Sequence, residues 1–150
     1  MKTFLSIGSG PGIGAATAER FAREGYRVIL SSRDTGKLAE RAAQLAAKGY
    51  QVETRTVDAG DLASVTALVR EVEARFGSID VLHFNSASMR AATIDQQDAD
   101  TFVPDLTVNI GAALVAVQEA SRAMLARASQ APSCSPEASL RLHPSPNICR

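Results

Sequence analysis

Cysteine is scarce in this sequence. Among 150 residues only Cys134 and Cys149 occur, and both lie near the C-terminus. They provide neither a disulfide framework nor a metal-ligand spacing, so we expect no metal site and, by default, a cytoplasmic protein. Net charge is also lacking, since sixteen basic residues balance sixteen acidic ones. This balance gives no reason to expect nucleic acid or membrane partners.

Long apolar runs are missing too. No run in the sequence approaches the length of a membrane span, which again predicts no membrane association. The apolar start Phe4–Ile7 leads directly into glycines, which is typical of a strand and not of a signal peptide. Apolar residues make up 45% of the chain and charged residues 21%, as in an ordinary soluble domain with one core.

What the sequence does have is a regular alternation of helical and strand patterns. Helical stretches stop at Gly25, Gly49 and Gly77, and a β-rich run follows each stop. Glycine just past a helix can take the left-handed conformation that ends it. The apolar runs Phe4–Ile7 and Val28–Leu30 are continuous, which suits strands buried on both faces. The order β-α-β-α-β-α-β-α predicts an α/β fold with a parallel sheet between two helical layers.

The helical segments carry apolar residues at i, i+3 and i+4 spacing, which predicts one buried face for each helix. In the third helix these residues are Leu62, Val65, Leu68, Val69, Val72 and Phe76, and in the second they are Leu38, Ala42 and Leu45. We expect Asp61 to cap the third helix at its N-terminus, and Asp34 or Thr35 to cap the second.

The last helix is predicted to span about Thr101–Ala126, with Pro104 as a potential break. Its inward face is predicted to consist of Phe102, Leu106, Ile110, Leu114, Val117 and Leu125. After about Arg127 the pattern is lost, and four of the six prolines follow Ala131. We therefore divide the chain into one globular domain, residues 1–126, and an irregular tail, residues 127–150, of a composition typical of disorder.

The strongest chemical signal is the segment Gly8-Ser9-Gly10-Pro11-Gly12-Ile13-Gly14. It follows a predicted strand and opens a predicted helix, which is the context that a phosphate-binding turn requires. Glycines let the backbone turn tightly and approach a pyrophosphate, and the helix N-terminus offers free N–H groups and partial positive charge to the anion. The alternative is a glycine-rich turn without a ligand, but the three further β-α units around it favour a Rossmann-type dinucleotide-binding domain.

Four motifs in order along about 125 residues resemble the short-chain dehydrogenase/reductase family. They are the glycines at 8, 12 and 14, the segment Val57-Asp58-Ala59-Gly60, the strand Ile79–Ala87 and the segment Val108-Asn109-Ile110-Gly111. Four positions depart from the family pattern, because Ile7 stands for Thr, Phe84 for the first Asn of the strand motif, and Ser86-Ala87 for Ala-Gly. These departures indicate a divergent member of the family.

The resemblance implies a doubly wound parallel sheet of about four strands in the order 3-2-1-4. It also implies hydride transfer between a nicotinamide cofactor and a small-molecule carbonyl or alcohol. It assigns Asp58 to the adenine, Asn85 to the ribose region and Asn109 to the catalytic set, and it gives the long helix after Asp100 a role in packing two copies of the chain together. The motif and the resemblance together assign cofactor contacts to Gly8, Ser9, Gly10, Gly12, Ile13, Gly14, Ser32, Arg33, Asp58, Asn85, Ser86 and Ala87.

The end of the second strand indicates which dinucleotide is bound. NAD-preferring proteins place an acid there to accept hydrogen bonds from the ribose 2′-OH, whereas this sequence has Ser31-Ser32-Arg33. The planar guanidinium of Arg33 can hold a 2′-phosphate, and family resemblance points the same way. We therefore predict NADP over NAD. The alternative is that Arg33 is only a solvated surface charge.

The proton donor of the family is missing. Members use a Tyr followed four residues later by a Lys, but Tyr26 is followed at that spacing by Leu30, and Tyr50 by Thr54. A second hypothesis is therefore a catalytically inactive nucleotide-binding or dimerisation module, and a third is a chain without function that aggregates through an exposed sheet edge.

His83, on the fourth predicted strand, is interpreted as a core or sheet-edge histidine.

The tail offers one explanation for this gap. In the frame that begins one base earlier, the codons for residues 128–138 can encode Gly-Lys-Pro-Ser-Ala-Ile-Leu-Leu-Thr-Gly-Gly, which resembles the strand that follows the long helix in the family. Our hypothesis is that residues after about Arg127 result from a frameshift and that the chain is a truncated member. Resequencing the gene across the codons for Leu125 to Arg150 tests this hypothesis.

Overall fold

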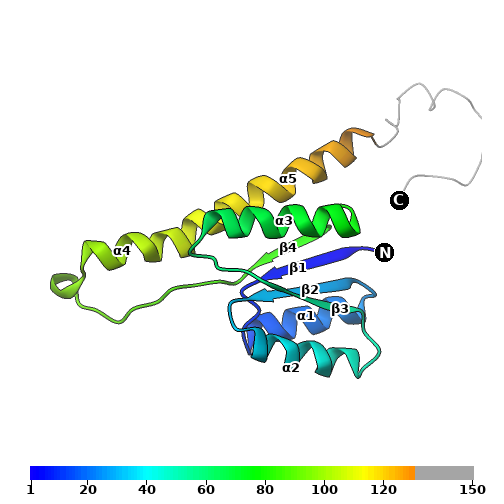
Figure 1. Ribbon diagram of the computed structural model, residues 1–150, viewed down its shortest axis with the longest axis horizontal. Helices are drawn as coiled ribbons and strands as arrows, with labels where there is room; N and C mark the ends of the chain where they lie inside the picture. Colours follow the sequence, from blue (N-terminus) through cyan, green and yellow to red (C-terminus); the bar gives the residue numbers. More distant parts are fainter. Residues whose placement is uncertain (131–150) are drawn as a thin grey trace, which may run out of the picture.

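The computed structural model describes residues 1–130 of the chain (Figure 1). The elements in chain order are β1 (Thr3–Ile7), α1 (Ile13–Arg23), β2 (Arg27–Ser32), α2 (Thr35–Ala46), β3 (Val52–Thr56), α3 (Leu62–Phe76), β4 (Val81–Phe84), the 3₁₀ turn η1 (Ile94–Gln96), α4 (Ala99–Leu106), the π-helical turn η2 (Thr107–Gly111) and α5 (Ala112–Gln130). The tail from residue 131 on, including most of the segment assigned to the frameshift, lies outside the described residues.

The four strands form one parallel sheet in the order β3-β2-β1-β4, which confirms the predicted fold class and strand order. β1 lies in the centre, with Ile7 opposite Ser31 of β2 and opposite Phe84 of β4. The chain therefore winds outward from β1 in one direction through β2 and β3, and then returns to the other side of β1 with β4. All four strands point their carboxyl ends toward the same edge of the sheet, which is where ligands bind in such folds.

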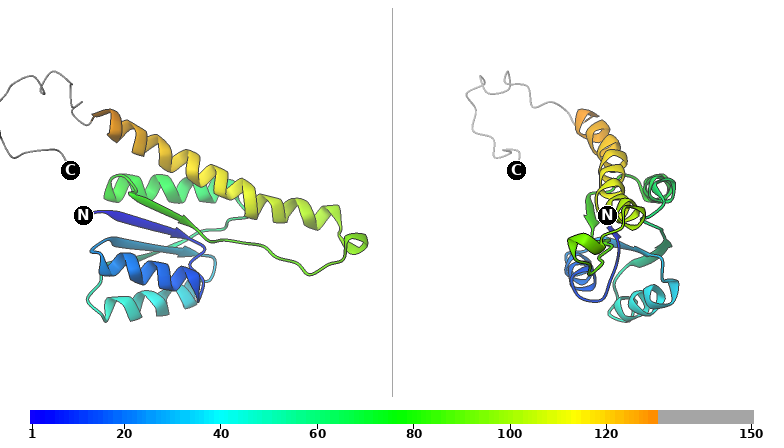
Figure 2. Two further views of the ribbon diagram at one scale, coloured as in Figure 1. Left: turned by 180° about the vertical axis from the view of Figure 1, so that it is seen from behind. Right: turned by 90° about the vertical axis from the view of Figure 1, so that its left-hand side faces the viewer.

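Helices cover both faces of the sheet. α1 and α2 lie on one face, and α3 and α5 lie side by side on the other (Figures 1 and 2). The strand residues alternate between these layers, so that Phe4 and Leu30 pack with α1 and α2 while Leu5 and Ile29 pack with α3 and α5. This double burial explains why the strand sequences are continuous apolar runs and do not alternate with polar residues.

The predicted N-terminal caps of α2 and α3 and the three predicted glycine stops are confirmed. The Asp34 carboxylate accepts a hydrogen bond from the Lys37 N–H at the start of α2, and the Asp61 carboxylate accepts one from the Ala63 N–H at the start of α3. Three glycines adopt positive φ just past helices, namely Gly25 (79°), Gly49 (82°) and Gly77 (83°).

The long helix differs from its prediction in its bounds and in the face it buries. It ends at Gln130 and not near Ala126, so residues 127–130 of the predicted tail are helical. It begins at Ala99 and continues through Pro104, and the departure from α-helical geometry comes later, in η2. The second difference is the face it buries. The residues predicted to point inward are 38–69% exposed, namely Phe102, Leu106, Ile110, Leu114, Val117 and Leu125.

Small residues occupy the buried face of α5 instead. Ala112, Ala116 and Ala120 are at most 1% exposed and pack with α3 and the sheet. The i, i+4 spacing of these alanines lets the helix backbone approach closely, and Glu119 beside them accepts hydrogen bonds from Arg70 of α3. The prediction failed because it ranked residues by hydrophobic size, whereas the close approach to α3 selects residues by their small volume.

The same helix also limits the prediction about apolar runs. The stretch Ala99–Ser129 is long and apolar enough to cross a membrane, because an 18-residue window within it has a mean hydropathy of 1.3. A core helix of a soluble protein can meet these criteria as well. The expectation of no membrane association therefore remains a prediction.

Candidate functional site

A cleft lies at the carboxyl edge of the sheet, where the strand order reverses beside β1. This cavity of about 300 Å³ is bounded by segments that each follow a strand: Gly8–Pro11 after β1, Ser32–Asp34 after β2, Val57 after β3 and Asn85–Ala87 after β4, together with Lys37 and Arg41 of α2. A crevice at the switch point of a doubly wound sheet is the usual ligand site of this architecture. We call it the edge cleft.

Gly8 is the point at which the turn touches the neighbouring strand. Its φ is +83°, and a Cβ built on it would lie 2.4 Å from the Ser86 nitrogen and 2.7 Å from the Asn85 carbonyl carbon. Asn85 closes this contact from the other side, because its backbone N–H donates to the Ile7 carbonyl (2.8 Å) and its side-chain amide donates to the Gly8 carbonyl (3.0 Å). Gly8 and Asn85 together hold the turn against β4.

Ser9 is an internal anchor of the turn. It is 1% exposed, its N–H donates to the Ser31 carbonyl (2.9 Å), and its hydroxyl donates to the Ser6 carbonyl (3.2 Å) and accepts from the Ser31 N–H (3.1 Å). The Ser9 carbonyl accepts a hydrogen bond from the guanidinium of Arg41. All polar groups of Ser9 are thus engaged by the protein, so its side chain supports the turn from beneath.

The N-terminus of α1 has no side-chain cap and comes directly after the turn residues Gly8–Pro11, which line the edge cleft. Within residues 1–130, no acceptor receives a hydrogen bond from the backbone N–H groups of Gly12, Ile13 or Gly14. Gly12 has a φ of +97° with open space where a Cβ would point, whereas a Cβ on Gly14 would lie 3.3 Å from the Ser9 Cα. Three N–H groups at a helix N-terminus, beside glycines that keep the backbone bare, form an arrangement that suits a phosphate.

The opposite wall of the edge cleft is basic. Arg33, Lys37 and Arg41 all line it, and Asp34 is its one carboxylate. The Asp34 side chain accepts from the Lys37 N–H, and this hydrogen bond is the main reason that the pKa of Asp34 lies below its usual value. Ser32 donates its hydroxyl to the Asp34 carbonyl (3.2 Å), which orders the segment after β2.

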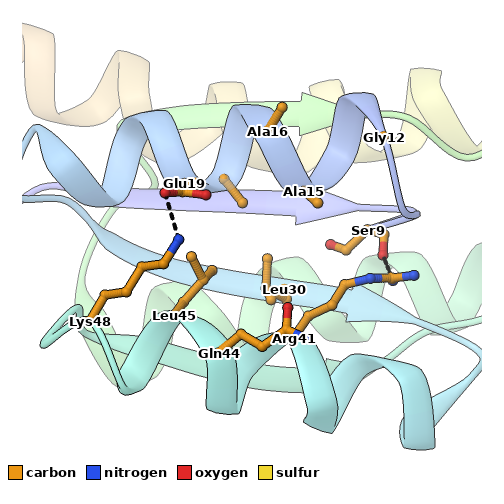
Figure 3. Close-up of a pocket in the computed structure, with 11 residues that line it drawn as sticks. Ser9, Gly12, Ala15, Ala16, Glu19, Leu30, Arg41, Gln44, Leu45 and Lys48 are labelled. Atoms are coloured by element: carbon orange, nitrogen blue, oxygen red, sulfur yellow. Dashed lines mark hydrogen bonds and ion pairs between the residues drawn. The ribbon is translucent and has the colours of Figure 1, made fainter.

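A second cavity of about 320 Å³ lies between α1 and α2 (Figure 3). It contacts the turn only through Ser9 and Gly12. Figure 3 shows Arg41 extending from α2 toward Ser9 at one end, and the ion pair between Lys48 and Glu19 (2.8 Å) at the other. Arg41 is therefore shared by this inter-helix cavity and the edge cleft.

Asp58 lies outside the edge cleft, in an adjoining hollow that also includes Arg33. Its carboxylate accepts from the Gly60 N–H (2.9 Å), and its own N–H donates to the Ser64 hydroxyl (3.2 Å). The predicted adenine contact thus sits on the far side of Arg33 from the glycine-rich turn, and its carboxylate retains an exposed edge.

Asn109 lies in η2 and holds the segment that follows β4. Its side-chain amide accepts from the Ser88 N–H (2.8 Å) and donates to the Ser88 carbonyl (2.9 Å). Ser88 also donates its hydroxyl to Asp105 (2.5 Å), and Arg90 pairs with the same carboxylate (2.9 Å). These two side chains, the Ser88 hydrogen bond first, lower the pKa of Asp105. Asn109 does not line the edge cleft.

His83 has a packing role, as the sequence suggested. Its ring stacks on Phe4 with centroids 5.8 Å apart, and its Nδ1 lies 3.1 Å from the Ser6 hydroxyl. Burial lowers the pKa of His83.

The structure thus gathers most of the predicted site residues and adds several. Gly8, Ser9, Gly10, Ser32, Arg33 and Asn85–Ala87 meet at the edge cleft. Five predicted site residues do not line it, namely Gly12, which lines the inter-helix cavity, Ile13, Gly14, Asp58 and Asn109. Lys37 and Arg41 were missed, although their i, i+4 and i+8 spacing from Arg33 is visible in the sequence. Ser31 and Ser6 were missed as well, because nothing in the sequence distinguishes a buried serine that supports a turn.

Comparison with known proteins relates most of the chain to one family. Residues 2–131 match the model of the short chain dehydrogenase family. The chain is 32% identical over 127 residues to the galactitol 2-dehydrogenase of Agrobacterium fabrum, which corresponds to 85% of this chain and 48% of that protein. The chain spans about half the length of the curated relatives it matches.

Solved structures give the same result. A short-chain dehydrogenase from Rhodopseudomonas palustris superposes with a TM-score of 0.78 at 31% identity, covering 84% of this chain and 59% of that one. A metagenomic short-chain oxidoreductase in complex with NADP superposes with a TM-score of 0.80 at 26% identity, covering 84% of this chain and 57% of that one.

Proposed function

Because the chain belongs to the short-chain dehydrogenase family, we propose that its edge cleft binds NADP(H) for oxidoreductase chemistry on a small-molecule carbonyl or alcohol. The observation that carries this proposal is the pairing of a glycine-rich helix N-terminus with a basic wall, without an acid at the end of β2. The galactitol 2-dehydrogenase among its relatives and the solved relative in complex with NADP support the substrate class and the dinucleotide.

The residues of the turn suit a pyrophosphate. Gly8 holds the turn against β4, and the N–H groups of Gly12, Ile13 and Gly14, which have no acceptor within the described residues, supply partial positive charge at the helix N-terminus that follows the cleft-lining residues Gly8–Pro11. Side chains larger than hydrogen at Gly12 would cover this surface, because its φ is positive and the space beside it is open. Asn85, Ser86 and Ala87 form the wall toward the sugar on the nicotinamide side.

The residues after β2 suit a 2′-phosphate better than a free 2′-OH. Ser32 and Arg33 occupy the place where NAD-binding proteins have an acid. Asp34 does not serve in its stead, because its carboxylate caps α2 and pairs with Lys37 (3.2 Å). The guanidinium of Arg33 is exposed at the rim of the cleft and can donate several hydrogen bonds to a phosphate.

When bound, NADPH supplies the hydride for carbonyl reduction. The contribution of this chain is to bind and orient the dinucleotide, with the turn holding the pyrophosphate and Asn85 fixing the strand beside it. Asn109, through Ser88, positions the segment after β4. The substitution of Ile7 for the family's Thr fits this view, because the buried serines Ser6, Ser9 and Ser31 supply the hydrogen bonds beneath the turn.

Replacing Arg33 by glutamine tests the choice of dinucleotide. We expect NADPH affinity, measured by the change in its fluorescence on binding, to fall by about tenfold or more, since hydrogen bonds to charged groups contribute about 1.5–3 kcal/mol. NADH affinity should hardly change. Arg20→Gln is the matched control, because Arg20 is an exposed arginine on α1 whose one ion pair within the described residues is with Glu24. Equal NADPH affinity in the Arg33 and Arg20 variants would contradict the proposal.

A second candidate function is a nucleotide-binding module without catalysis. The absence of a Tyr-x-x-x-Lys sequence favours it, because a carbonyl reduction needs a general acid near the reacting oxygen. We expect this 150-residue chain to bind NADPH but to show no oxidation of NADPH, followed at 340 nm, with a panel of aldehydes and ketones. Turnover above the rate without protein would refute the module and indicate a proton donor other than tyrosine.

We extend the proposal to self-association. The exposed residues of α4 and α5 form an apolar face, defined here by Phe102, Leu106, Ile110, Leu114 and Val117. α4 projects past the carboxyl edge of the sheet, and within the described residues no other element lies over it (Figure 1). A contiguous apolar face of this kind is typical of an interface, and a second copy of the chain is the proposed occupant.

A cytoplasmic location remains a prediction.

A further inference from the structure

We infer that Arg33, Lys37 and Arg41 act as one phosphate-binding stripe, in which Arg41 is a second determinant of specificity for the 2′-phosphate. We call these three residues the cation stripe. The inference rests on the proposed function and deepens it, because it assigns a dinucleotide contact to α2, beyond the segment that follows β2.

The cation stripe combines two residues of α2 with one that precedes the helix. Lys37 and Arg41 are four residues apart on α2, which brings their side chains to one face of the helix, and Arg33 comes just before the helix cap Asp34. All three line the edge cleft, opposite Gly8–Pro11. A ligand group that enters between the turn and α2 therefore meets the three cations from one side and the turn from the other.

The charges of the cation stripe are poorly balanced by the protein. Like charges at i, i+4 repel each other on a helix surface. Asp34 is the one carboxylate that lines the cleft, and both its oxygens contact Lys37. Oδ1 accepts a hydrogen bond from the Lys37 backbone N–H, and Oδ2 pairs with the Lys37 ammonium. Within the described part of the chain, neither Arg33 nor Arg41 forms an ion pair with a carboxylate. A dianionic phosphate between them would offset the repulsion.

Arg41 differs from the other two because it also binds the turn. Its Nη1 donates to the carbonyl of Ser9, the buried residue that anchors the turn. Figure 3 shows this side chain extended along the inter-helix cavity so that the guanidinium reaches the turn. A guanidinium carries five N–H donors in a planar fork, so one contact with Ser9 leaves others for a phosphate. The hydrogen bond to the turn thus fixes the Arg41 guanidinium in a position from which its other N–H groups can bind the phosphate.

The test compares nucleotide fragments that differ in one phosphate. We would measure the dissociation constants of 5′-AMP, 2′,5′-ADP and 3′,5′-ADP by isothermal titration calorimetry, for the full chain and for Arg33→Gln, Arg41→Gln and Arg41→Lys. Lys48→Gln is the matched control, because Lys48 is a cation that follows the C-terminus of α2 and lines the inter-helix cavity but not the edge cleft. Thermal unfolding of each variant shows that it is folded.

We expect Arg41→Gln to weaken 2′,5′-ADP by about tenfold and to leave 5′-AMP unchanged, as expected for a lost hydrogen bond to a charged group. Arg41→Lys should give a smaller loss than Arg41→Gln, because lysine keeps the positive charge. Some loss should remain, since an ammonium cannot bind Ser9 and a phosphate at once as the planar guanidinium does. Lys48→Gln should bind like the unsubstituted chain. Equal weakening of both nucleotides would overturn the inference, because it would mean that Arg41 only supports the turn. Equal affinity for 3′,5′-ADP and 2′,5′-ADP would overturn it too.

The remaining outcomes separate the two proposals. If Arg33→Gln abolishes the preference for 2′,5′-ADP while Arg41→Gln keeps it, the role of Arg41 is refuted and the proposed function stands. If no nucleotide binds to the unsubstituted chain, both the proposed function and the cation stripe are refuted.

Discussion

Replacing Gly8 by alanine is expected to destabilise the fold by about 3–5 kcal/mol and to abolish dinucleotide binding. Two effects add up at this position. The φ of +83° is costly for any residue with a Cβ, and the new Cβ would lie 2.4 Å from the Ser86 nitrogen and 2.7 Å from the Asn85 carbonyl carbon. Both are backbone atoms of the segment after β4, so relief requires β1 and β4 to separate at the cleft.

The matched control for this substitution lies in the same turn. Gly10 does not have a positive φ, and the nearest atom to a Cβ there would be the Gly8 carbonyl oxygen at 4.0 Å. Gly10→Ala should therefore unfold at nearly the same urea concentration as the unsubstituted chain. Urea unfolding followed by circular dichroism measures both variants. If Gly8→Ala and Gly10→Ala had the same midpoint, the close contact between the turn and β4 would be wrong.

Replacing Leu114 by glutamate should convert an assembly of the chain into monomers. Leu114 is 56% exposed and lies in the apolar face of α4 and α5. A carboxylate buried between two copies of this face, without a partner, costs several kcal/mol, which corresponds to a loss of affinity of about 100-fold or more. Static light scattering coupled to size-exclusion chromatography measures the mass as a function of protein concentration.

Ala67→Glu controls for the added charge. Ala67 is an exposed residue of α3, outside the apolar face, so this variant adds the same charge to a helix surface without entering the proposed interface. It should keep the mass of the unsubstituted chain. A dimer that survives Leu114→Glu unchanged would show that copies associate elsewhere, and an unsubstituted chain that is monomeric at all concentrations would refute self-association through this face.

The sequence by itself was sufficient for most of the elements and for the position of the glycine-rich turn between β1 and α1. Continuous apolar runs, glycine stops and N-terminal caps such as Asp61 are local signals, because each depends on the backbone conformation and hydrogen bonds of a few neighbouring residues. The glycine-rich turn is of the same kind, since its position between a strand and a helix is legible along the chain. The parallel sheet and the order 3-2-1-4 followed from these signals and from the family resemblance.

Only the tertiary structure decided which surfaces these elements present. Two apolar patterns run along the last helix, one of large residues and one of alanines. The buried residues are Ala112, Ala116 and Ala120, because the helix lies so close to α3 and the sheet that only small side chains fit between them. The Ser9 side chain points inward because its hydroxyl donates to the Ser6 carbonyl of β1 and accepts from the Ser31 N–H of β2. Arg41 joined the cleft because α2 lies beside the turn. Apart from the short-range contact between Ser9 and Ser6, these contacts join residues distant in sequence. Their geometry depends on how whole elements pack together, which local patterns do not encode.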